Sequence, residues 1–181
     1  MAERSGEGPQ GDGAGPELTH IDSGGRARMV DVTGKPWTRR RATARCRVDL
    51  GPRVAQVVGE TGGDESTSGG VGWAEVLGTA RLAGIQAAKQ TSTLIPLCHP
   101  LTVSNVDVHL TLVGDSVHVE GRAEVVGPTG VEMEALAACA VASLSVAATV
   151  LPIAPEVSIT EVGLWKKTGG RSGTWLRPTT R

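Results

Sequence analysis

The fold is decided by residues 131–150, VEMEALAACAVASLSVAATV, in which small and apolar side chains fill almost every position after two acids at the start. A helix that is apolar around its whole circumference is typical of a buried position in a core. Its length would also suit a membrane span, but Glu132, Glu134 and the many Ala and Ser residues argue against one. We therefore expect a core helix packed on more than one side, and Pro152 and Pro155 to end it.

The sequence on either side of this helix predicts strands and one further helix. Alternating apolar and polar side chains indicate half-buried strands, and Gly114-Asp115-Ser116 between two of them predicts a β-hairpin. The order strand, helix, strand, strand, helix, strand predicts an α+β fold of the ferredoxin-like, split βαβ type, with the helices on one face of an antiparallel sheet. The predicted strands are residues 44–50, 103–113, 117–126 and 156–163, and the predicted helices are residues 73–90 and 131–150.

The remaining segments are predicted to be less regular. The Gly, Glu and Pro content of residues 1–17 cannot offset the entropy of ordering them, so we expect a disordered leader. Residues 18–173 are expected to form a single domain and residues 174–181 a tail. Within the domain, we expect loop or irregular structure at residues 18–41, a short helix at 53–58 and a surface loop at 59–72.

The composition excludes several classes of protein. Lys and Arg total 18 and Asp and Glu total 19 among 181 residues, whereas a general nucleic-acid binder is usually basic. No membrane segment is expected, and residues 1–16 lack the apolar core of a signal peptide, which favours a cytoplasmic location. The chain has no Phe and no Tyr, so Val, Leu, Ile and Ala must build the core. Such side chains bury less area per residue, which suggests further stabilisation by homo-oligomerisation.

Two short segments could carry acid–base chemistry. His99 lies in the proline-bounded loop Leu97-Cys98-His99-Pro100, and imidazole titrates near neutral pH. A single histidine in a loop is more often an ordinary surface residue. Glu132 and Glu134 begin the second helix, where the helix dipole favours negative charge, so stabilisation of the helix end explains them equally well.

Two basic segments could bind an anion. Residues 166–173, KKTGGRSG, combine a glycine-rich turn with cations, and a flexible basic tail is the alternative. Lys35 and residues 38–41, TRRR, form the second cluster, which could equally be a solvated strand edge. Together with His99 and the acids, these clusters suggest an anion-binding pocket. The cysteines are far apart, and His99 and Cys98 have no third ligand beside them, so no metal and no cofactor is expected.

Several segments, in the same order, resemble the cyclic pyranopterin monophosphate synthase family (MoaC, molybdenum cofactor biosynthesis). This resemblance implies a ferredoxin-like fold and a hexamer built from dimers, with the site at a dimer interface. It also implies a lyase that rearranges cyclised GTP (3′,8-cyclo-dihydroguanosine triphosphate) to a pterin with release of pyrophosphate. The matching segments are residues 18–22 (LTHID), 29–32 (MVDV), 79–89 (TARLAGIQAAK), 94–101 (LIPLCHPL), 129–136 (TGVEMEAL) and 169–173 (GGRSG).

The resemblance also implies roles for individual residues. The family's catalytic lysine before the last Gly-Gly corresponds to Lys167, and we expect His99 and Glu134 to act with it in catalysis. Glu132 and Arg40 are expected to contribute to binding a phosphorylated purine or pterin. The substrate-binding residues of the family correspond to Leu97, Cys98, His99, Met133 and Glu134.

Three residues depart from the family's pattern. Trp73 stands where the family has a lysine, and Ala148 and Leu151 stand where it has an aspartate and a lysine. Loss of one acid–base group typically costs 10²- to 10⁴-fold in rate. One hypothesis is a family lyase in which other groups compensate. A second is a paralogue repurposed in specialised metabolism for a less charged substrate. The third is a non-catalytic homologue that binds a ligand or an oligomer partner. The groups that could compensate are His20, His99, Glu75 and Lys166.

Overall fold

The computed structural model describes residues 18–54 and 72–178 of the chain. The chain divides into two compact units, residues 1–30 and residues 31–181, and every named helix and strand belongs to the second. The elements are β1 (Thr38–Asp49), α2 (Trp73–Lys89), α3 (Thr91–Leu94), β2 (Asn105–Val113), β3 (Ser116–Gly127), α4 (Glu132–Val150), β4 (Ser158–Thr168) and β5 (Trp175–Leu176).

The described part of the first unit, residues 18–30, is organised around Asp22. One oxygen of its carboxylate accepts hydrogen bonds from the backbone N–H groups of Gly24 and Arg26, and the other accepts one from the Arg26 side chain. A bridge between Ile21 and Ala27 closes the turn. His20, one of the groups expected to compensate for lost chemistry, is exposed within this unit.

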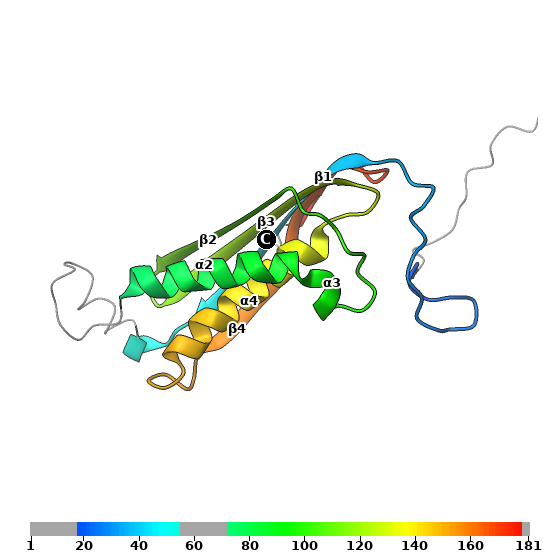
Figure 1. The fold of residues 1–181 in the computed structure, drawn as a ribbon. Coiled ribbons are helices and arrows are strands. Elements are labelled where there is room, and N and C mark those ends of the chain that lie inside the picture. Colours follow the sequence, from blue (N-terminus) through cyan, green and yellow to red (C-terminus); the bar gives the residue numbers. More distant parts are fainter. Residues whose placement is uncertain (1–17, 55–71, 179–181) are drawn as a thin grey trace, which may run out of the picture. The chain divides into compact units, whose positions relative to one another are not determined.

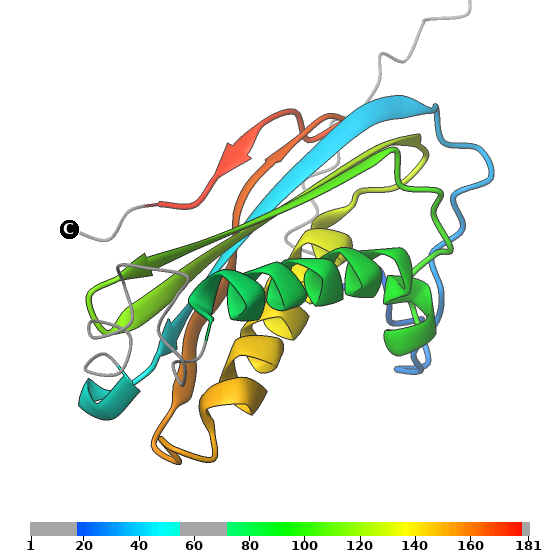
Figure 2. The same ribbon diagram turned by 60° about the vertical axis from the view of Figure 1, so that its left-hand side comes forward.

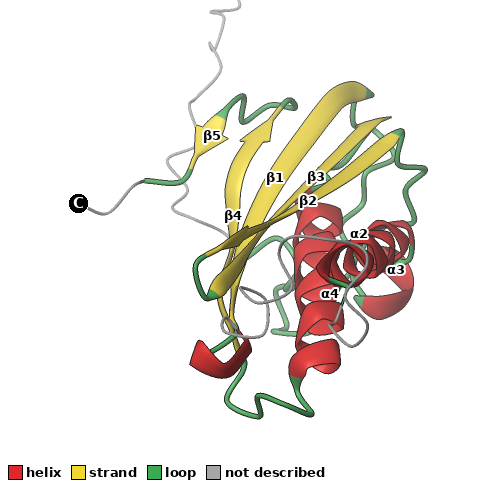
Figure 3. Ribbon diagram, turned by 90° about the vertical axis from the view of Figure 1, so that its left-hand side faces the viewer, coloured by secondary structure: helices red, strands yellow, loops and turns green. Residues whose placement is uncertain are grey.

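The second unit is an antiparallel sheet covered on one face by α2 and α4 (Figures 1 and 2). The strand order is β2-β3-β1-β4-β5, so β1 lies between β3 and β4. Each long helix connects two strands that have a third strand between them, which is the arrangement of a split βαβ fold. Figure 3 shows α2, α3 and α4 gathered on one side of the sheet and none of them on the other side. The predicted ferredoxin-like α+β class is confirmed.

Close contacts between backbones hold the helix layer on the sheet. A Cβ added to Gly121 of β3 would lie 2.9 Å from the carbonyl oxygen of Ala135 in α4. A Cβ added to Gly84 of α2 would lie 2.7 Å from the carbonyl oxygen of Ala138. Real Cβ atoms do not lie this close to another atom, so only glycine fits at the two positions. The missing side chains let α4 lie directly against β3 and α2. By length and composition α4 could also cross a membrane, as core helices of folded domains also could.

The exposed side of α4 remains apolar. The helix buries residues such as Ala138, Ala142 and Val146 against the sheet and α2. Met133 and Leu144 of α4 and the following Leu151 are exposed in the single chain. The prediction of packing on more than one side therefore holds for two sides, and the third is left uncovered.

The structure extends two strands beyond their predicted bounds. β1 begins at Thr38, within the segment expected to be loop, because Arg39 and Arg41 both donate hydrogen bonds to Glu124 on β3. β4 continues to Thr168, so Lys166 and Lys167 lie in a strand and pair with β1. Trp175 and Leu176, in the expected tail, pair with the same two lysines.

Other sequence predictions fall on the undescribed residues. The expected disordered leader at residues 1–17 and most of the loop at residues 59–72 lie outside the described ranges. Residues 52–54 form a helical turn, but the rest of the short helix expected at 53–58 is also outside them. The predicted helices at 73–90 and 131–150 and the predicted hairpin are confirmed to within about two residues at each end.

The close contact at Gly84 can be tested against a second glycine of α2. We expect Gly84→Ala to lower the free energy of unfolding by about 1–3 kcal/mol, because the new methyl group would overpack the contact with α4. Gly78→Ala is the matched control, since no atom lies within 4 Å of its added Cβ, and it should raise stability by about 0.5–1 kcal/mol through helix propensity. Urea unfolding of the three proteins measures both changes. Equal stability of the two variants would contradict the packing described.

Candidate active site

Most of the predicted site residues converge at one end of the helix layer. Glu132 and Glu134 lie in the first turn of α4, and Lys167 lies near the end of β4. Lys167 Nζ is 3.3 Å from an Oε1 oxygen of Glu132. The charge of Glu134 reaches Cys98, in the loop that follows α3. The structure therefore brings together residues from three separate segments of the sequence.

Glu134 is the most deeply buried acid of this group. Its side chain is only 4% exposed. Burial raises its pKa above the ordinary value of 4.5, its own backbone N–H acts in the opposite direction, and the nearby Glu132 carboxylate raises the pKa further. A carboxyl group with a raised pKa can retain a proton and act as a general acid.

Burial also raises the pKa of the Cys98 thiol, and the charge of Glu134 raises it further. The thiol is the form that this setting favours, so Cys98 is suited to contact with a ligand and not to nucleophilic attack. Leu97 and His99 beside it are half-buried, and Met133 is exposed next to Glu134.

Arg40 supports the turn that leads into α4. Its Nε donates a hydrogen bond of 3.1 Å to the carbonyl of Gly127, and its Nη2 donates one of 3.0 Å to the carbonyl of Pro128. Gly169 and Gly170 lie against Arg39 and Arg40 so closely that a Cβ at either position would collide with them. Both glycines have positive φ, of 97° and 70°, which other residues rarely adopt. Arg40 therefore stabilises the turn through these hydrogen bonds, and its guanidinium also carries a positive charge there.

A cationic hollow of about 460 Å³ adjoins this turn. It brings together the two basic segments that the sequence suggested, with Lys35 and Arg40 from one and Arg171 from the other. No carboxylate of the described residues lines it, and the buried Oγ1 of Thr38 has no hydrogen-bond partner among them. Guanidinium groups, a lysine and a glycine-rich turn are the groups that bind phosphate. The full lining is Lys35, Pro36, Thr38, Arg40, Pro128, Thr129, Gly170, Arg171 and Ser172.

His99 lies near the same hollow. The pKa of Asp31 is lowered first by hydrogen bonds from Thr33, and the charges of Lys35 and His99 lower it further. His99 is therefore close enough to interact with Asp31, which is four residues before Lys35 of the hollow. The sequence pointed to Lys35 and His99 but gave no sign that Thr38, Thr129 and Ser172 would bring hydroxyl groups to the same place.

The residues that depart from the family's pattern lie at the other end of the helix layer. Fourteen residues separate Glu134 from Ala148, which is about 21 Å along a helix that rises 1.5 Å per residue. Trp73 is the first residue of α2. It lies about 24 Å along that helix from Lys89, and Lys89 is at the end that leads toward the His99 loop. Ala148 and Leu151 are exposed, and the buried Nε1 of Trp73 has no hydrogen-bond partner within residues 18–54 and 72–178.

The described residues contain no group of three or more His, Cys, Asp or Glu side chains placed to hold a metal ion. The chemistry available at this end of the fold is thus that of a buried carboxyl, a lysine–glutamate pair, a histidine and a cationic hollow.

Replacing Glu134 by Gln tests its burial through the pH dependence of stability. The folded protein binds more protons at Glu134 than the unfolded chain does above pH 4.5, because the folded pKa is raised. The wild-type protein should therefore lose stability relative to Glu134→Gln as pH rises from 4 toward neutrality. Urea unfolding of both proteins across this range measures the difference. Glu161→Gln, at an exposed position, is the control for replacing a carboxylate by an amide. A pH-independent difference for Glu134→Gln would contradict the assignment.

Comparison with known proteins finds one family model and several similar proteins that share a name. The family model described as MoaC family matches residues 29–170. A protein of Streptomyces coelicolor named cyclic pyranopterin monophosphate synthase is 46% identical over 172 residues, which cover 93% of this chain and 96% of the relative. A protein of the same name from Thermomicrobium roseum is 48% identical over 163 residues, covering 89% and 93% of the two chains. The mitochondrial enzyme of that name from Arabidopsis thaliana is 45% identical over 163 residues, covering 89% of this chain and 57% of its own. With the matched residues spanning most of the described fold and both ends of the helix layer, the chain belongs to the MoaC family.

Proposed function

We propose that this protein is a lyase of the cyclic pyranopterin monophosphate synthase type, which rearranges a cyclised GTP to a pterin with release of pyrophosphate. The observation that carries this proposal is the buried Glu134, whose pKa burial raises, next to the Lys167–Glu132 pair and the cationic hollow. The names of the relatives, at 42–48% identity, supply the reaction type.

The parts of the site suit the parts of such a substrate. Phosphates would lie in the hollow against Lys35, Arg40 and Arg171, where no carboxylate opposes them. The heterocycle would reach toward Leu97, Cys98 and Met133, which are apolar or neutral. Glu134 would donate a proton, and Lys167 would stabilise developing negative charge once the substrate displaces its interaction with Glu132.

We also propose that the working site needs two copies of the chain. The two ends of α4 lie too far apart, at about 21 Å, to contact one small substrate in one protomer. Met133, Leu144 and Leu151 leave an apolar edge uncovered, which a second α4 running in the opposite direction could bury. That pairing would bring Leu151 of one copy toward Glu134 of the other. It supports dimers, and the resemblance to the family extends the proposal to a hexamer.

A second candidate function has its own observation. Trp73, Ala148 and Leu151 replace two cations and an acid with an aromatic and two apolar side chains. A site completed by these residues would receive a less charged substrate better than a triphosphate, because unpaired charge is costly next to apolar groups. The candidate is a repurposed lyase or cyclase that keeps Glu134 and Lys167 and accepts a different phosphorylated heterocycle.

The two candidates are separated by turnover of enzymatically prepared cyclised GTP, followed as pyrophosphate and pterin. The Streptomyces coelicolor relative serves as the reference. If the first candidate is correct, this protein turns over within about tenfold of the reference, because loss of even one needed acid–base group would cost more. No turnover would contradict the first candidate and leave the second.

A rescue variant shows whether the retained end is competent. In Trp73→Lys with Ala148→Asp and Leu151→Lys, turnover should rise if the far end alone limits the reaction. Adding Glu134→Gln to that variant should then lower turnover by about 10²-fold or more, since a general acid is lost. Rescue that survives Glu134→Gln would contradict the role given to Glu134.

A further inference from the structure

A second hollow lies on the face of the sheet that no helix covers. Its volume is about 580 Å³, which is within the range of pockets for small ligands. It is formed by β1, β2, β3 and β4, whose outward side chains include three arginines and two histidines. Its full lining is Arg45, Cys46, Arg47, His109, Thr111, His118, Val119, Glu120, Arg122, Glu161 and Trp165.

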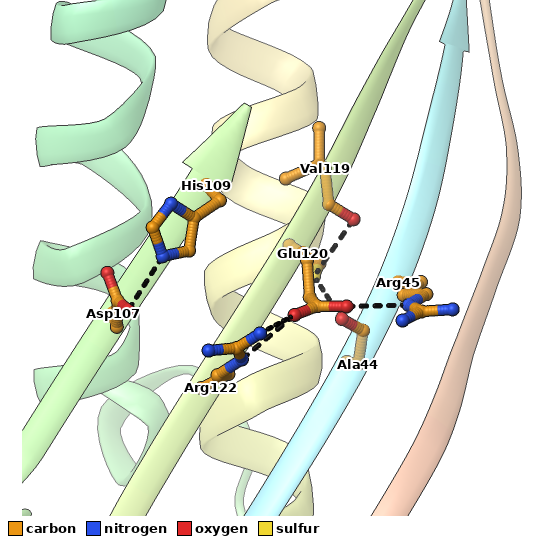
Figure 4. Close-up of polar contacts among 8 residues, drawn as sticks. Ala44, Arg45, Asp107, His109, Val119, Glu120 and Arg122 are labelled. Carbon is orange, nitrogen blue, oxygen red and sulfur yellow. Dashed lines mark hydrogen bonds and ion pairs between the residues drawn. The ribbon is translucent and has the colours of Figure 1, made fainter. Parts of the chain in front are cut away.

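A row of polar side chains crosses this hollow at a single level of the sheet. His109 on β2 pairs in register with Glu120 on β3, and Glu120 pairs with Arg45 on β1. Glu120 accepts a hydrogen bond of 2.7 Å from Arg45 Nε, and bonds of 2.8 and 2.5 Å from Arg122 Nε and Nη2 (Figure 4). Burial opposes the charge of Glu120, but these bonds outweigh it and lower the pKa of its carboxyl. Two guanidinium groups thus share one carboxylate, which leaves an excess positive charge in this row, and the Glu161 carboxylate also lines the hollow.

Donor atoms remain for a ligand. The Nη groups of Arg45 and the Nη1 group of Arg122 make no hydrogen bond within the described residues. The side chain of His118, which also lines the hollow, makes no hydrogen bond with the described residues either. His109 is held on one side only, with its Nε2 2.8 Å from Asp107. These donors lie around the same opening and suit an acceptor with several oxygens, such as a phosphate.

Both irregularities of β4 lie at this hollow. The register between β1 and β4 shifts once at Trp165 and once at residues 161–162, so each shift inserts an extra residue into β4. Glu161, at the second bulge, has a φ of 55°, a conformation that a residue other than glycine rarely adopts. β-bulges redirect side chains and are frequent beside functional sites. Here they place Trp165 and Glu161 in the lining of one hollow.

Trp165 gives the hollow a stacking surface. The guanidinium carbon of Arg45 lies 4.5 Å from the centre of the Trp165 ring. A guanidinium that stacks on an aromatic ring with one face can stack on a second ring with the other. An inorganic phosphate alone would leave most of 580 Å³ unfilled, whereas a phosphate carrying a heterocycle would use both the donors and the stack.

We propose that the helix-free face of the sheet binds a phosphorylated heterocycle, with Arg45, Arg122 and His118 on the phosphate and the ring stacked on the Arg45–Trp165 pair. This site is separate from the candidate active site, which lies on the helix side of the fold. Its existence does not rest on the proposed lyase function.

Fluorine NMR of protein labelled with 5-fluorotryptophan tests the site directly. The chain has four Trp, and Trp165→Phe assigns the resonance of Trp165. Guanosine 5′-monophosphate is the probe, with guanosine and inorganic phosphate as the two partial ligands. We expect guanosine 5′-monophosphate to move the Trp165 resonance saturably at about 1 mM or below, and both partial ligands to bind at least about fivefold more weakly. No movement of that resonance up to about 10 mM would overturn the site. Equal binding of phosphate and nucleotide would overturn the stacking.

The sheet itself offers a matched pair of variants. Glu124 accepts hydrogen bonds from Arg39 and Arg41, just as Glu120 does from Arg45 and Arg122, but that group does not line the hollow. Arg122→Gln should raise the dissociation constant at Trp165 by about tenfold, because a charged hydrogen-bond donor is lost. Arg41→Gln should leave it within about twofold while removing an equivalent ion pair. Equal effects of the two variants, at unchanged thermal stability, would show that the nucleotide binds elsewhere.

Discussion

The structure depends on the direct contact of α4 with β3 and α2 at Gly121 and Gly84. At these two positions the helix backbone lies so close that no side chain could be added. The sequence has no Phe and no Tyr to fill a wider space, and most of the fully buried core is Ala and Val. Small side chains let the helices and the sheet pack at a short distance. At that distance, a change in the volume of any core side chain disturbs the packing. The contact fixes the position of α4 on the sheet, and with it the positions of both ends of the helix.

The two ends of α4 have different chemical character. The first turn has a buried acid, an ion pair and a cationic hollow beside it. The last turn and the start of α2 present Ala148, Leu151 and Trp73. An enzyme that kept its phosphate-binding and proton-donating groups while losing charge at the far end would have changed the part that recognises or turns over its substrate. The proposed function therefore depends on the first-turn end, where the buried acid, the ion pair and the cationic hollow lie.

Much of the fold could be predicted from the sequence, because its signals are local. The apolar repeat of α2, the small-residue composition of α4 and the alternation of β2 and β3 each lie within one segment. The start of β1 was missed because Arg39 and Arg41 look like a solvated cluster until Glu124 on β3 accepts their hydrogen bonds. The end of β4 was missed because Lys166 and Lys167 find strand partners far away in the sequence.

The candidate site, too, could be predicted only where the signal lies within one short segment of the sequence. The short segments with His99, Glu134 and Lys167 could be recognised, and the structure brings these segments to the same end of the helix layer. Their depth of burial could not be predicted, since Glu134 is buried by packing of the helix on the sheet and not by its neighbours in the sequence. The hollow on the other face gave no sequence signal, because it depends on two register shifts and on a row of side chains drawn from four strands.

Crosslinking between the two ends of α4 tests most directly whether two copies complete the site. In a Cys98→Ser background, which removes the half-buried native thiol, Met133→Cys and Leu151→Cys would place exposed thiols about 27 Å apart along one chain, while the native Cys46 and Cys139 are buried. With a bismaleimide too short to span that distance, the double variant should form covalent dimers, and each single variant should form far fewer. A double variant that crosslinks no more than the single variants would contradict a site shared between antiparallel α4 helices.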